Sequence, residues 1–326
     1  MAEEGRGNVN KESPGRTRRC GTPSHGSLEV FLLKKLLLLI NPNAGTRQAR
    51  RFLPEMISVF NKADYLCSVY VTERRGDATD FARVHAGEAD LVVACGGDGT
   101  LNEVITGLQL GGHKPLLGYI PCGSTNDFAS GLGLPTVPLM ACDAIVAGRP
   151  RTLDVGLFSP DRYFSYTASF GAFTSVSWST PQNVKNVLGH AAYILEGIRS
   201  LADIRPIHMR ITADGQVFEE DYIFGAVCNS TSLGGVLKLE DNAVDMNDGR
   251  FEALLIPFPP DLIALNRILN ALRTHHYEHE SLQFLRASSF LFEGSSDVTW
   301  TLDGEAAEGS SRVEIRNIHD AIKLIC

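Results

Sequence analysis

The first half of the chain alternates short, continuously apolar runs with longer segments of helical periodicity. The run Leu36–Ile40 has no polar face, which is typical of a parallel strand that is covered on both sides. Strands are expected at residues 36–42, 65–72, 91–96 and 115–123, and helices at residues 47–63, 77–87 and 137–149, with one more from about Leu101. This alternation, from Lys35 to about Asp154, predicts an α/β layer around a parallel sheet.

The pattern changes after Asp154. Strand-like segments now follow one another, and the pairs Asp214-Gly215 and Asp303-Gly304 have the Asp-Gly sequence that favours two-residue hairpin turns. Helical segments interrupt the strands at residues 187–202 and 262–275, and in the second an apolar stripe falls on residues 262, 265, 268, 269 and 272. We expect an α/β domain at residues 33–154 and a mainly antiparallel β domain at residues 155–326, whose last strands can return to the first domain.

Residues 1–32 differ in composition from the remainder. They are rich in Gly, Arg, Ser and Pro and poor in large apolar side chains, which predicts a disordered leader. A natural start near Leu33 is one hypothesis, because the codons for Leu28–Val30 can contain the ribosome-binding sequence GGAGG. Codons for Leu28–Val30 that lack GGAGG would contradict this hypothesis.

Composition restricts the class of protein. Hydrophobic residues make up 44% of the 326 residues and charged residues 21%, which is enough for a sizeable core. The formal net charge of -8 argues against a general nucleic-acid binder, which would carry a basic surplus. The seven cysteines are dispersed and form no CxxC pair, as expected in a reducing cytoplasm. The longest apolar run, Phe31–Ile40, is shorter than the about 20 residues that span a bilayer, so any membrane contact should be peripheral.

Three glycine-rich turns follow predicted strands of the first domain. They are Asn41–Gly45, Gly96–Asn102 and Pro121–Ala129. Loops at the carboxyl ends of parallel strands converge, and glycines with amides and hydroxyls suit the close approach of anionic oxygens. The chain contains no Walker A sequence GxxxxGK[ST], and Asn102 stands where a GxGxxG fingerprint beginning at Gly97 needs glycine. For Gly96–Gly99 alone, an ordinary surface turn is the alternative.

These motifs resemble the diacylglycerol kinase family, in particular its soluble bacterial lipid kinases, to which sphingosine kinases are related. The resemblance covers Lys35–Cys326 and rests on the strings LLLLINPNAG, GGDGTLNEVITGL, GSTNDFA, TLDVG, DGRFEALL and LDGE, which occur in the family's order. It implies the fold of NAD kinases and diacylglycerol kinases, an α/β domain with a parallel sheet followed by a mainly antiparallel β domain.

The resemblance implies an ATP site on the glycine-rich turns. Its residues would be Asn41, Pro42, Asn43, Ala44, Gly45, Thr72, Gly96, Gly97, Asp98, Gly99, Thr100, Leu101, Asn102 and Ser124. Asp98 resembles the family's essential aspartate, which acts through Mg²⁺ on the nucleotide phosphates. An acidic loop can serve phosphates in this way because the hard cation lies between the two negative charges.

Further roles follow from the same resemblance. Glu305 resembles the general base for the lipid hydroxyl, and Asn126, Asp127 and Asp154 resemble the polar network that holds Asp98 and its waters. An ionised glutamate can accept a hydroxyl proton when the substrate lies within about 3 Å. Judged from the residues alone, Glu305 can also be a solvated residue after a turn, and Asp154 a capping or turn residue.

A second, structural Mg²⁺ is implied by a segment of Gram-positive family members that matches DMNDGR. Its candidate ligands are the Asp248 side chain and the carbonyl groups of Asp245 and Arg250. An ordinary acidic turn before a strand is the alternative.

The expected function is ATP-dependent phosphorylation of a lipid hydroxyl, with diacylglycerol as acceptor and phosphatidic acid as product, in the cytoplasm at the inner face of the membrane. A sphingoid base, phosphatidylglycerol or undecaprenol stays open as the acceptor, and relatives commonly form homodimers. NAD kinases share GGDGT, but GSTNDFA counts against that function. The joint presence of Asp98, Asn126, Asp127, Asp154 and Glu305 argues against a non-catalytic lipid- or nucleotide-binding regulator.

Overall fold

The computed structural model describes residues 33–45, 47–171, 205–229, 232–233, 237–238, 245–274 and 280–326. Leu33–Cys326 form one compact unit. The expected leader at residues 1–32 and the expected helix at residues 187–202 lie outside the described residues.

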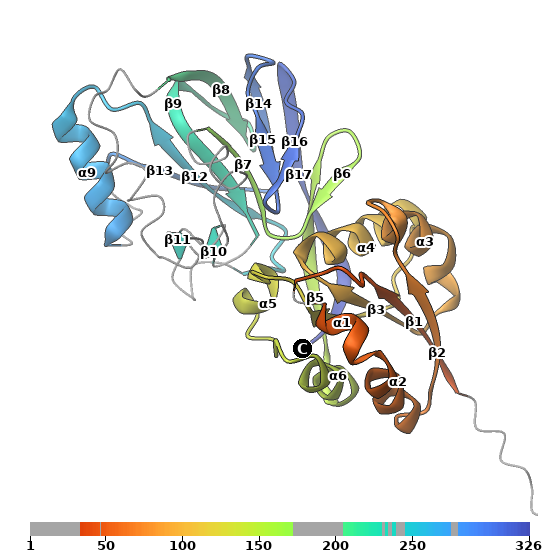
Figure 1. Cartoon of the computed structure of the whole chain (residues 1–326). Helices are drawn as coiled ribbons and strands as arrows, with labels where there is room; N and C mark the ends of the chain where they lie inside the picture. The colour runs from red at the N-terminus through yellow and green to blue at the C-terminus, as the bar shows by residue number, and fades with distance from the viewer. Residues whose placement is uncertain are drawn as a thin grey trace, which may run out of the picture. The chain divides into compact units, whose positions relative to one another are not determined.

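Four parallel strands form the sheet of the N-terminal part (Figure 1). In the spatial order of the sheet they are β2 (Tyr65–Val71), β1 (Lys34–Ile40), β3 (Leu91–Gly96) and β4 (Leu116–Pro121). Each strand lies where the sequence predicted one, β2 from its aromatic and β-branched residues and the others from apolar runs, so the predicted parallel sheet is confirmed. β1 shows why its run is continuous: Leu37 and Leu39 pack on one face of the sheet, and Leu36, Leu38 and Ile40 pack on the other.

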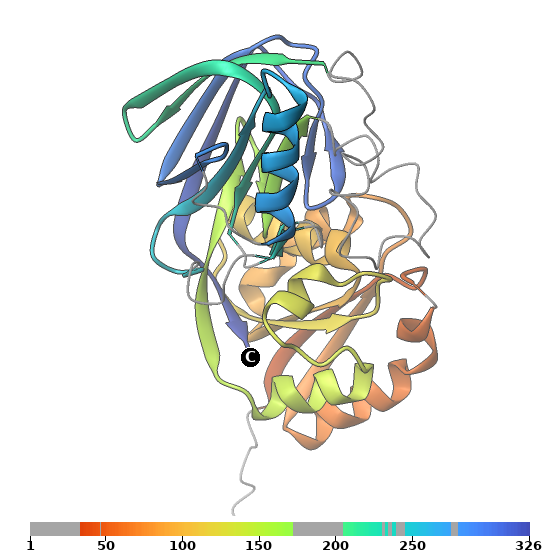
Figure 2. The ribbon, with the colours of Figure 1, turned by 90° about the vertical axis from the view of Figure 1, so that its left-hand side faces the viewer.

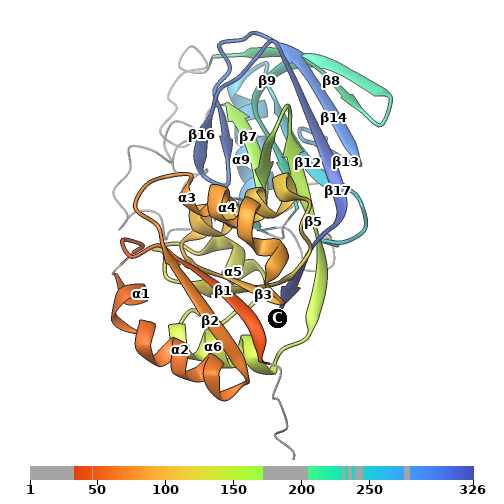
Figure 3. The ribbon, with the colours of Figure 1, turned by 90° about the vertical axis from the view of Figure 1, so that its right-hand side faces the viewer.

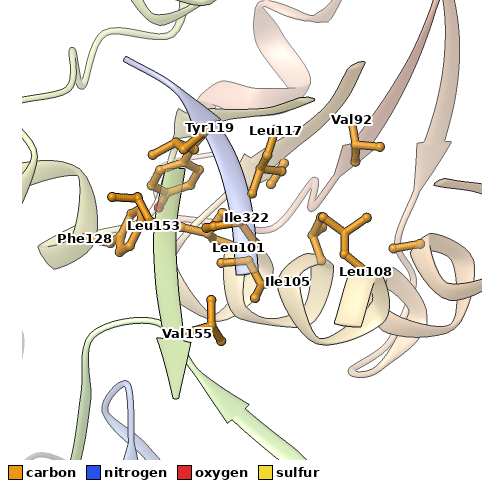
Figure 4. Packing of buried hydrophobic residues seen from close by; sticks show 14 of the residues in the cluster. Val92, Leu101, Ile105, Leu108, Leu117, Tyr119, Phe128, Leu153, Val155 and Ile322 are labelled. Carbon is orange, nitrogen blue, oxygen red and sulfur yellow. The ribbon is translucent and has the colours of Figure 1, made fainter. Parts of the chain in front are cut away.

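Helices cover both faces of this sheet. They are α1 (Gln48–Arg51), α2 (Leu53–Lys62), α3 (Asp77–His85), the 3₁₀ helix η1 (Ala86–Glu88), α4 (Asp98–Gly111), α5 (Asp127–Gly131) and α6 (Pro138–Ala147). α3 and α4 pack on one face, and α2 and α6 pack on the other (Figure 3). Figure 4 shows the first of these two cores, to which α4 contributes Leu101, Ile105 and Leu108.

The helix expected at residues 47–63 is divided into α1 and α2. Pro54 lies in the first turn of α2, where its missing N–H group is not needed for a helical hydrogen bond. The second helix therefore begins at Leu53, after a non-helical Phe52.

The helix expected from about Leu101 begins earlier, at Asp98. The extended backbone of Gly97 lets the helix start directly after β3. This early start places Asp98 in the first turn of α4, at the positive end of the helix dipole.

The C-terminal part is built mainly from antiparallel strands. They are β5 (Pro150–Phe158), β6 (Arg162–Phe164), β7 (Thr167–Gly171), β8 (Ile207–Ala213), β9 (Gln216–Cys228), β10 (Ser232–Leu233), β11 (Leu237–Lys238), β12 (Phe251–Pro257), β13 (Gln283–Ala287), β14 (Ser289–Gly294), β15 (Trp300–Leu302), β16 (Glu305–Ala307) and β17 (Arg312–Ile325). The hairpins β8–β9 and β15–β16 turn at Asp214-Gly215 and Asp303-Gly304, where all four residues have positive φ. Both predicted hairpins are confirmed.

The last strand, β17, belongs to both parts of the sheet. Its first residues pair with β14, its last residues pair in parallel with β4, and β5 runs antiparallel beside it. Among the described residues a single 15-stranded sheet therefore connects β16 at one end with β2 at the other. The predicted mixed fold, a parallel α/β part with an antiparallel β part, is confirmed.

An aromatic core and one long helix lie on opposite faces of the antiparallel strands. On one face, the ring of Trp300 lies 4.9 Å from Phe170 and 5.0 Å from Phe292, measured between ring centres. On the other face, α9 (Leu262–Arg273) lies across the strands and buries Leu265, Ile268, Ala271 and Leu272 (Figure 2).

Leu262, which was predicted to belong to the apolar stripe of α9, is 50% exposed. It is the first residue of the helix, and a helical side chain covers the turn that precedes its own Cα. The Leu262 side chain therefore projects beyond the surface that α9 covers. The prediction that Leu262 belongs to the buried stripe was wrong.

Candidate active site

The loops that follow β1, β2, β3 and β4 lie at one edge of the sheet, because the four strands are parallel. Backbone hydrogen bonds join neighbouring loops: the amide of Asn41 donates to the carbonyl of Cys95 at 2.9 Å, and that of Cys122 to the carbonyl of Gly96 at 2.7 Å. The predicted nucleotide residues therefore gather along the edge where open parallel sheets bind ligands.

Glycines allow these loops to approach one another closely. A Cβ atom on Gly123 would lie 2.6 Å from the Cα of Gly97. A Cβ atom on Gly45, whose φ is +50°, would lie 2.4 Å from the carbonyl oxygen of Cys122. The loops thus meet backbone to backbone, which fits a surface that presents main-chain amides to phosphate oxygens.

Two threonine hydroxyls form hydrogen bonds behind these loops, on the side that faces the protein interior. The Thr100 hydroxyl accepts a hydrogen bond from the side-chain Nδ2 of Asn41 at 3.3 Å. The Thr100 side chain also fills the space that a Cβ on Gly96 would need. Thr72 is buried, and its hydroxyl donates to the carbonyl of Ile40 at 3.4 Å. Both threonines therefore support the loops from within the protein.

The other predicted nucleotide residues differ in exposure. Asn43 and Ser124 are exposed at the edge of the sheet, where a ligand can reach their side chains. Pro42 and Ala44 are buried, and Leu101 lies in the core with no exposed surface. Leu101 can therefore contribute to a ligand site only through its backbone.

Asp98 is held by groups of the neighbouring strand β4 and of the first turn of helix α5. Its Oδ2 accepts the amide of Asp127 at 2.9 Å, and its Oδ1 faces the amide of Phe128 and the hydroxyl of Tyr119, each at 3.4 Å. Burial raises the pKa of the Asp98 carboxyl, while these hydrogen bonds favour the charged form. A cation would offset the cost of this desolvation, so the site suits a metal-bound phosphate.

Asn126 shapes the turn that leads into α5, whose first two residues supply those amides. Its φ is +54°, a left-handed conformation that asparagine tolerates, and its side chain accepts the amide of Gly123 at 2.9 Å. The same side chain donates to the Gly123 carbonyl at 3.1 Å, which closes the turn. The structure therefore brings Asp98, Asn126 and Asp127 together, with Asp127 using its backbone amide for this contact.

Glu305 reaches the same end of α4 from the β15–β16 hairpin. A Cβ atom on Gly99 would lie 2.9 Å from Glu305 Oε1, so the carboxylate lies over the first turn of the helix. Glu305 Oε2 accepts a hydrogen bond from Arg75 at 2.5 Å, and its side chain is 46% exposed. Asp98 and Glu305, far apart in the sequence, thus both lie at the N-terminal end of α4.

A buried carboxylate, Asp303, holds this hairpin against α4. It accepts the three consecutive amides of residues 165–167 at 2.6 to 3.0 Å, and the Asn102 side chain donates to it at 2.9 Å. Burial raises the pKa of Asp303 to about 6, although the four donors favour its charged form. Asn102, predicted as a nucleotide residue, therefore ties α4 to the hairpin that carries Glu305.

Asp154 has a different set of partners. It is 1% exposed on β5, and its carboxylate accepts the amides of Gly249 at 2.8 Å and Asp320 at 3.0 Å and contacts His319 Nδ1 at 2.9 Å. These contacts join the acidic turn before β12 to β17, and Asp98 is not among them. The part of Asp154 in the network around Asp98 stays a prediction.

The acidic turn itself is closed by the protein's own groups. Asp245 and Asp248 each accept the amide of the residue two positions further on, at 3.1 and 2.9 Å. Asp248 also contacts the guanidinium of Arg286, and the carbonyl of Arg250 accepts the Asn317 side chain at 3.2 Å. In the described parts of the chain no three His, Cys, Asp or Glu side chains group as a metal site. The predicted ligands are of another kind, one side chain and two carbonyl groups, so the structural Mg²⁺ site stays a prediction.

Three residues of the site were missed by sequence reasoning: Asp303, Glu103 and Arg75. Asp303 looked like a turn residue only, because nothing local shows that the segment 165–167 covers it. Glu103 accepts the amide of Gly76 at 2.9 Å and so holds the loop that carries Arg75. Its place inside GGDGTLNE was the available signal, since an acidic side chain beside buried helix positions needs a partner.

Comparisons with known proteins extend over both parts of the chain. Residues 35–158 match the diacylglycerol kinase catalytic domain, and residues 169–326 match the YegS C-terminal NAD kinase beta sandwich-like domain. A diacylglycerol kinase of Staphylococcus saprophyticus is 35% identical over 274 residues, which are 83% of this chain and 89% of that protein. A diacylglycerol kinase of Bacillus subtilis is 33% identical over 276 residues, which are 84% and 90%.

The structural comparison agrees. A crystal structure from Bacillus anthracis strain Sterne, of a protein provisionally assigned as a diacylglycerol kinase, superposes with a TM-score of 0.76 at 26% identity. It covers 90% of this chain and 95% of that one. Fold and site thus define a lipid kinase with a parallel α/β part and a β-sandwich part. The chain belongs to the diacylglycerol kinase family, and membership of this family implies ATP as the phosphoryl donor.

Proposed function

We propose that this chain transfers the γ-phosphoryl group of ATP to the hydroxyl group of diacylglycerol, with phosphatidic acid as the product. One observation carries the proposal: Glu305 and Asp98 both lie at the N-terminus of α4, beside the glycine-rich loops. A group that can accept a hydroxyl proton and a group that can hold a phosphate-bound cation are thus at the same helix end, in a member of a lipid kinase family.

The nucleotide side of the reaction uses the edge of the parallel sheet. The close approach of Gly97 and Gly123 supports a role for their loops in binding phosphates through backbone amides. The N-terminus of α4 adds the positive end of a helix dipole. When bound, Mg²⁺ would be held by Asp98 and would neutralise charge on the β- and γ-phosphate oxygens.

The acceptor side uses the β15–β16 hairpin. Glu305 accepts the hydroxyl proton while the hydroxyl oxygen forms a bond to the γ-phosphorus and the bond from that phosphorus to ADP breaks. Asp303 and Asn102 keep the hairpin at the helix end, so the base and the phosphate loops hold a constant distance. This positioning supplies much of the rate enhancement in phosphoryl transfer, where little covalent chemistry falls to the protein.

The lipid acceptor requires contact with a membrane. No described helix of the chain has the length and apolar character needed to cross one. Peripheral contact with the cytoplasmic face therefore belongs to the proposal.

The test is incubation with labelled ATP, Mg²⁺ and a panel of lipids in mixed micelles. Transfer of label to diacylglycerol is expected, with loss of transfer in EDTA. Glu305→Gln should lower kcat by about 10²- to 10⁴-fold, the range for removal of a general base, and Asp98→Asn by at least as much. Glu308→Gln, an exposed glutamate three positions further on, is the matched control and should keep full activity.

Each outcome decides a different part of the proposal. No labelled lipid from any acceptor would contradict the kinase activity of this chain. Full activity in Glu305→Gln would contradict only the assignment of the base. A higher kcat/KM for a sphingoid base, phosphatidylglycerol or undecaprenol than for diacylglycerol would replace the acceptor and keep the reaction.

A further inference from the structure

Arg75 places a cation on the group that we propose as the general base. It lies in the loop between β2 and α3, at the same edge of the sheet as the glycine-rich loops. Its Nη2 donates to Glu305 Oε2 at 2.5 Å, and the two side chains are 70% and 46% exposed. A paired carboxylate has one oxygen occupied, so the base role of Glu305 does not by itself explain this contact.

The backbone on both sides of Arg75 is held in place. On the C-terminal side, Glu103 of α4 accepts the amides of Gly76 at 2.9 Å and Ala78 at 3.3 Å. On the N-terminal side, Asp77 accepts the amides of residues 73 and 74 at 2.8 and 2.9 Å. The loop is therefore fixed to the same helix that carries Asp98, while the exposed Arg75 side chain can change its partner.

Phosphoryl transfer brings the γ-phosphate next to this side chain. A general base lies about 3 Å from the hydroxyl oxygen that it deprotonates, and that oxygen lies about 3–3.5 Å from the phosphorus that it attacks. A guanidinium in contact with Glu305 is therefore within one side-chain rotation of the transferred group. Its fork of N–H donors matches the oxygens of a phosphate better than any other side chain does.

Charge favours the exchange of partners. The site already contains the carboxylates of Asp98, Glu103, Asp303 and Glu305 around the first turns of α4. A bound triphosphate adds several negative charges to this region, and it competes with a single carboxylate for the guanidinium. Release of Glu305 then leaves both of its oxygens available to the acceptor hydroxyl.

We propose that Arg75 is a catalytic residue that binds the γ-phosphoryl group of ATP. Without nucleotide it pairs with Glu305; with ATP it turns to the γ-phosphate oxygens and stabilises their charge during transfer. The assignment rests on the function proposed above, because it requires Glu305 and the nucleotide to lie on the same side of α4.

Nucleotide binding tests the assignment without lipid. Affinities for ADP and for the imido analogue of ATP, both with Mg²⁺, are to be measured by titration calorimetry. The wild-type chain should prefer the analogue, and Arg75→Gln should lose about 10- to 100-fold in affinity for the analogue but little for ADP. Arg74→Gln is the matched control, since Arg74 lies in the same loop and pairs with Asp77 at 3.0 Å; it should keep both affinities.

Two more variants separate a phosphate contact from support of the loop. Glu305→Gln removes the competitor for Arg75, so its affinity for the analogue should rise while that for ADP stays constant. Arg75→Lys keeps the charge without the fork and should recover part of the preference for the analogue. A residue that only supported the loop would change ADP and analogue binding together.

The assignment is overturned if the wild-type chain binds both nucleotides equally, or if Arg75→Gln keeps the wild-type preference. If Arg75→Gln loses the preference for the analogue but the wild-type chain phosphorylates no lipid, the phosphate contact is supported and the proposed function is contradicted. If the wild-type chain phosphorylates lipid but Arg75→Gln keeps the preference, the proposed function is supported and the assignment of Arg75 is contradicted.

Discussion

Three carboxylates of the site have different surroundings, and the surroundings separate their roles. Asp98 is held by the first two amides of α5, which fix the position of its carboxylate. Asp303 is buried and accepts four hydrogen bonds, so it is a structural group. Glu305 is half exposed over the helix end, where a substrate can reach it. Accessibility therefore favours Glu305, among these three carboxylates, for the proton transfer that we propose.

Asp303 should give the protein a measurable dependence of stability on pH. Burial raises the pKa of its carboxyl from 3.8 to about 6, so between these values the folded chain holds a proton that the unfolded chain releases. The contribution of Asp303 to the free energy of unfolding is therefore highest below pH 3.8. It falls by about 2–3 kcal/mol as the pH rises through about 6. Urea unfolding of wild type and Asp303→Asn across this range isolates the contribution. Parallel pH curves for the two proteins would contradict it.

At the scale of elements, α4 serves the core and the site together. Its apolar positions pack against the sheet (Figure 4), and its first turn carries Asp98. Contact with α3 is close at Gly107, where a Cβ atom would lie 2.4 Å from the carbonyl oxygen of Thr79. The helix pair thus depends on a small residue at one point.

Gly107→Ala should therefore destabilise the protein, by about 1–3 kcal/mol for overpacking. Helix propensity alone predicts the opposite sign, a gain of up to about 1 kcal/mol. Gly112→Ala, at φ +66° with nothing within 4 Å of the added atom, is the control for backbone strain without a clash. Denaturant unfolding decides the sign, and stabilisation by Gly107→Ala would disprove the close packing of α3 on α4.

The paired glycine loops give a second prediction at this scale. Gly123→Ala would place a Cβ atom 2.6 Å from Gly97 Cα and should push the two loops apart. We expect the KM for ATP to rise about tenfold or more, because the loop amides then lose their alignment on the phosphates. Gly133→Ala, which has positive φ but no neighbour within 4 Å, should leave this KM unchanged. Equal effects of the two variants would exclude a phosphate role for the Gly97–Gly123 contact.

For the whole molecule, β17 connects the parallel and antiparallel parts. It pairs with β14 of the antiparallel part and with β4 of the parallel sheet, and β5 accompanies it through the junction. One core contains Leu101 of α4 together with Val155 of β5 and Ile322 of β17 (Figure 4). The two parts therefore share a strand and a core, and we expect them to unfold together.

Ile322→Ala tests this coupling. The side chain is 3% exposed, so the truncation should cost about 2–5 kcal/mol. Tryptophan fluorescence, to which Trp300 of the antiparallel core contributes, and far-UV circular dichroism should both shift to lower denaturant with coincident midpoints. Separate transitions, or a shift in one signal alone, would mean that the parts unfold independently.

The sequence by itself determined the features that depend on neighbouring residues. Apolar runs predicted the strands of the parallel sheet, and the Asp-Gly pairs at 214 and 303 predicted two hairpins, because periodicity and turn geometry are local properties. The positions of the glycine-rich turns after predicted strands also indicated that these loops gather at one edge of the sheet, since parallel strands bring their carboxyl ends together. Boundaries such as the early start of α4 needed the conformation of Gly97, which local pattern does not specify.

Only the tertiary structure decided which distant groups meet. Arg75 and Glu305 are 230 positions apart, and Asn102 and Asp303 are 201 apart. The partners of Asp154 come from the acidic turn and from β17, although its motif suggested the surroundings of Asp98. The physical reason is that such contacts depend on how the β15–β16 hairpin and β17 pack against the first half of the chain. That packing is set by the pairing of whole strands and by burial, which no short segment of sequence contains.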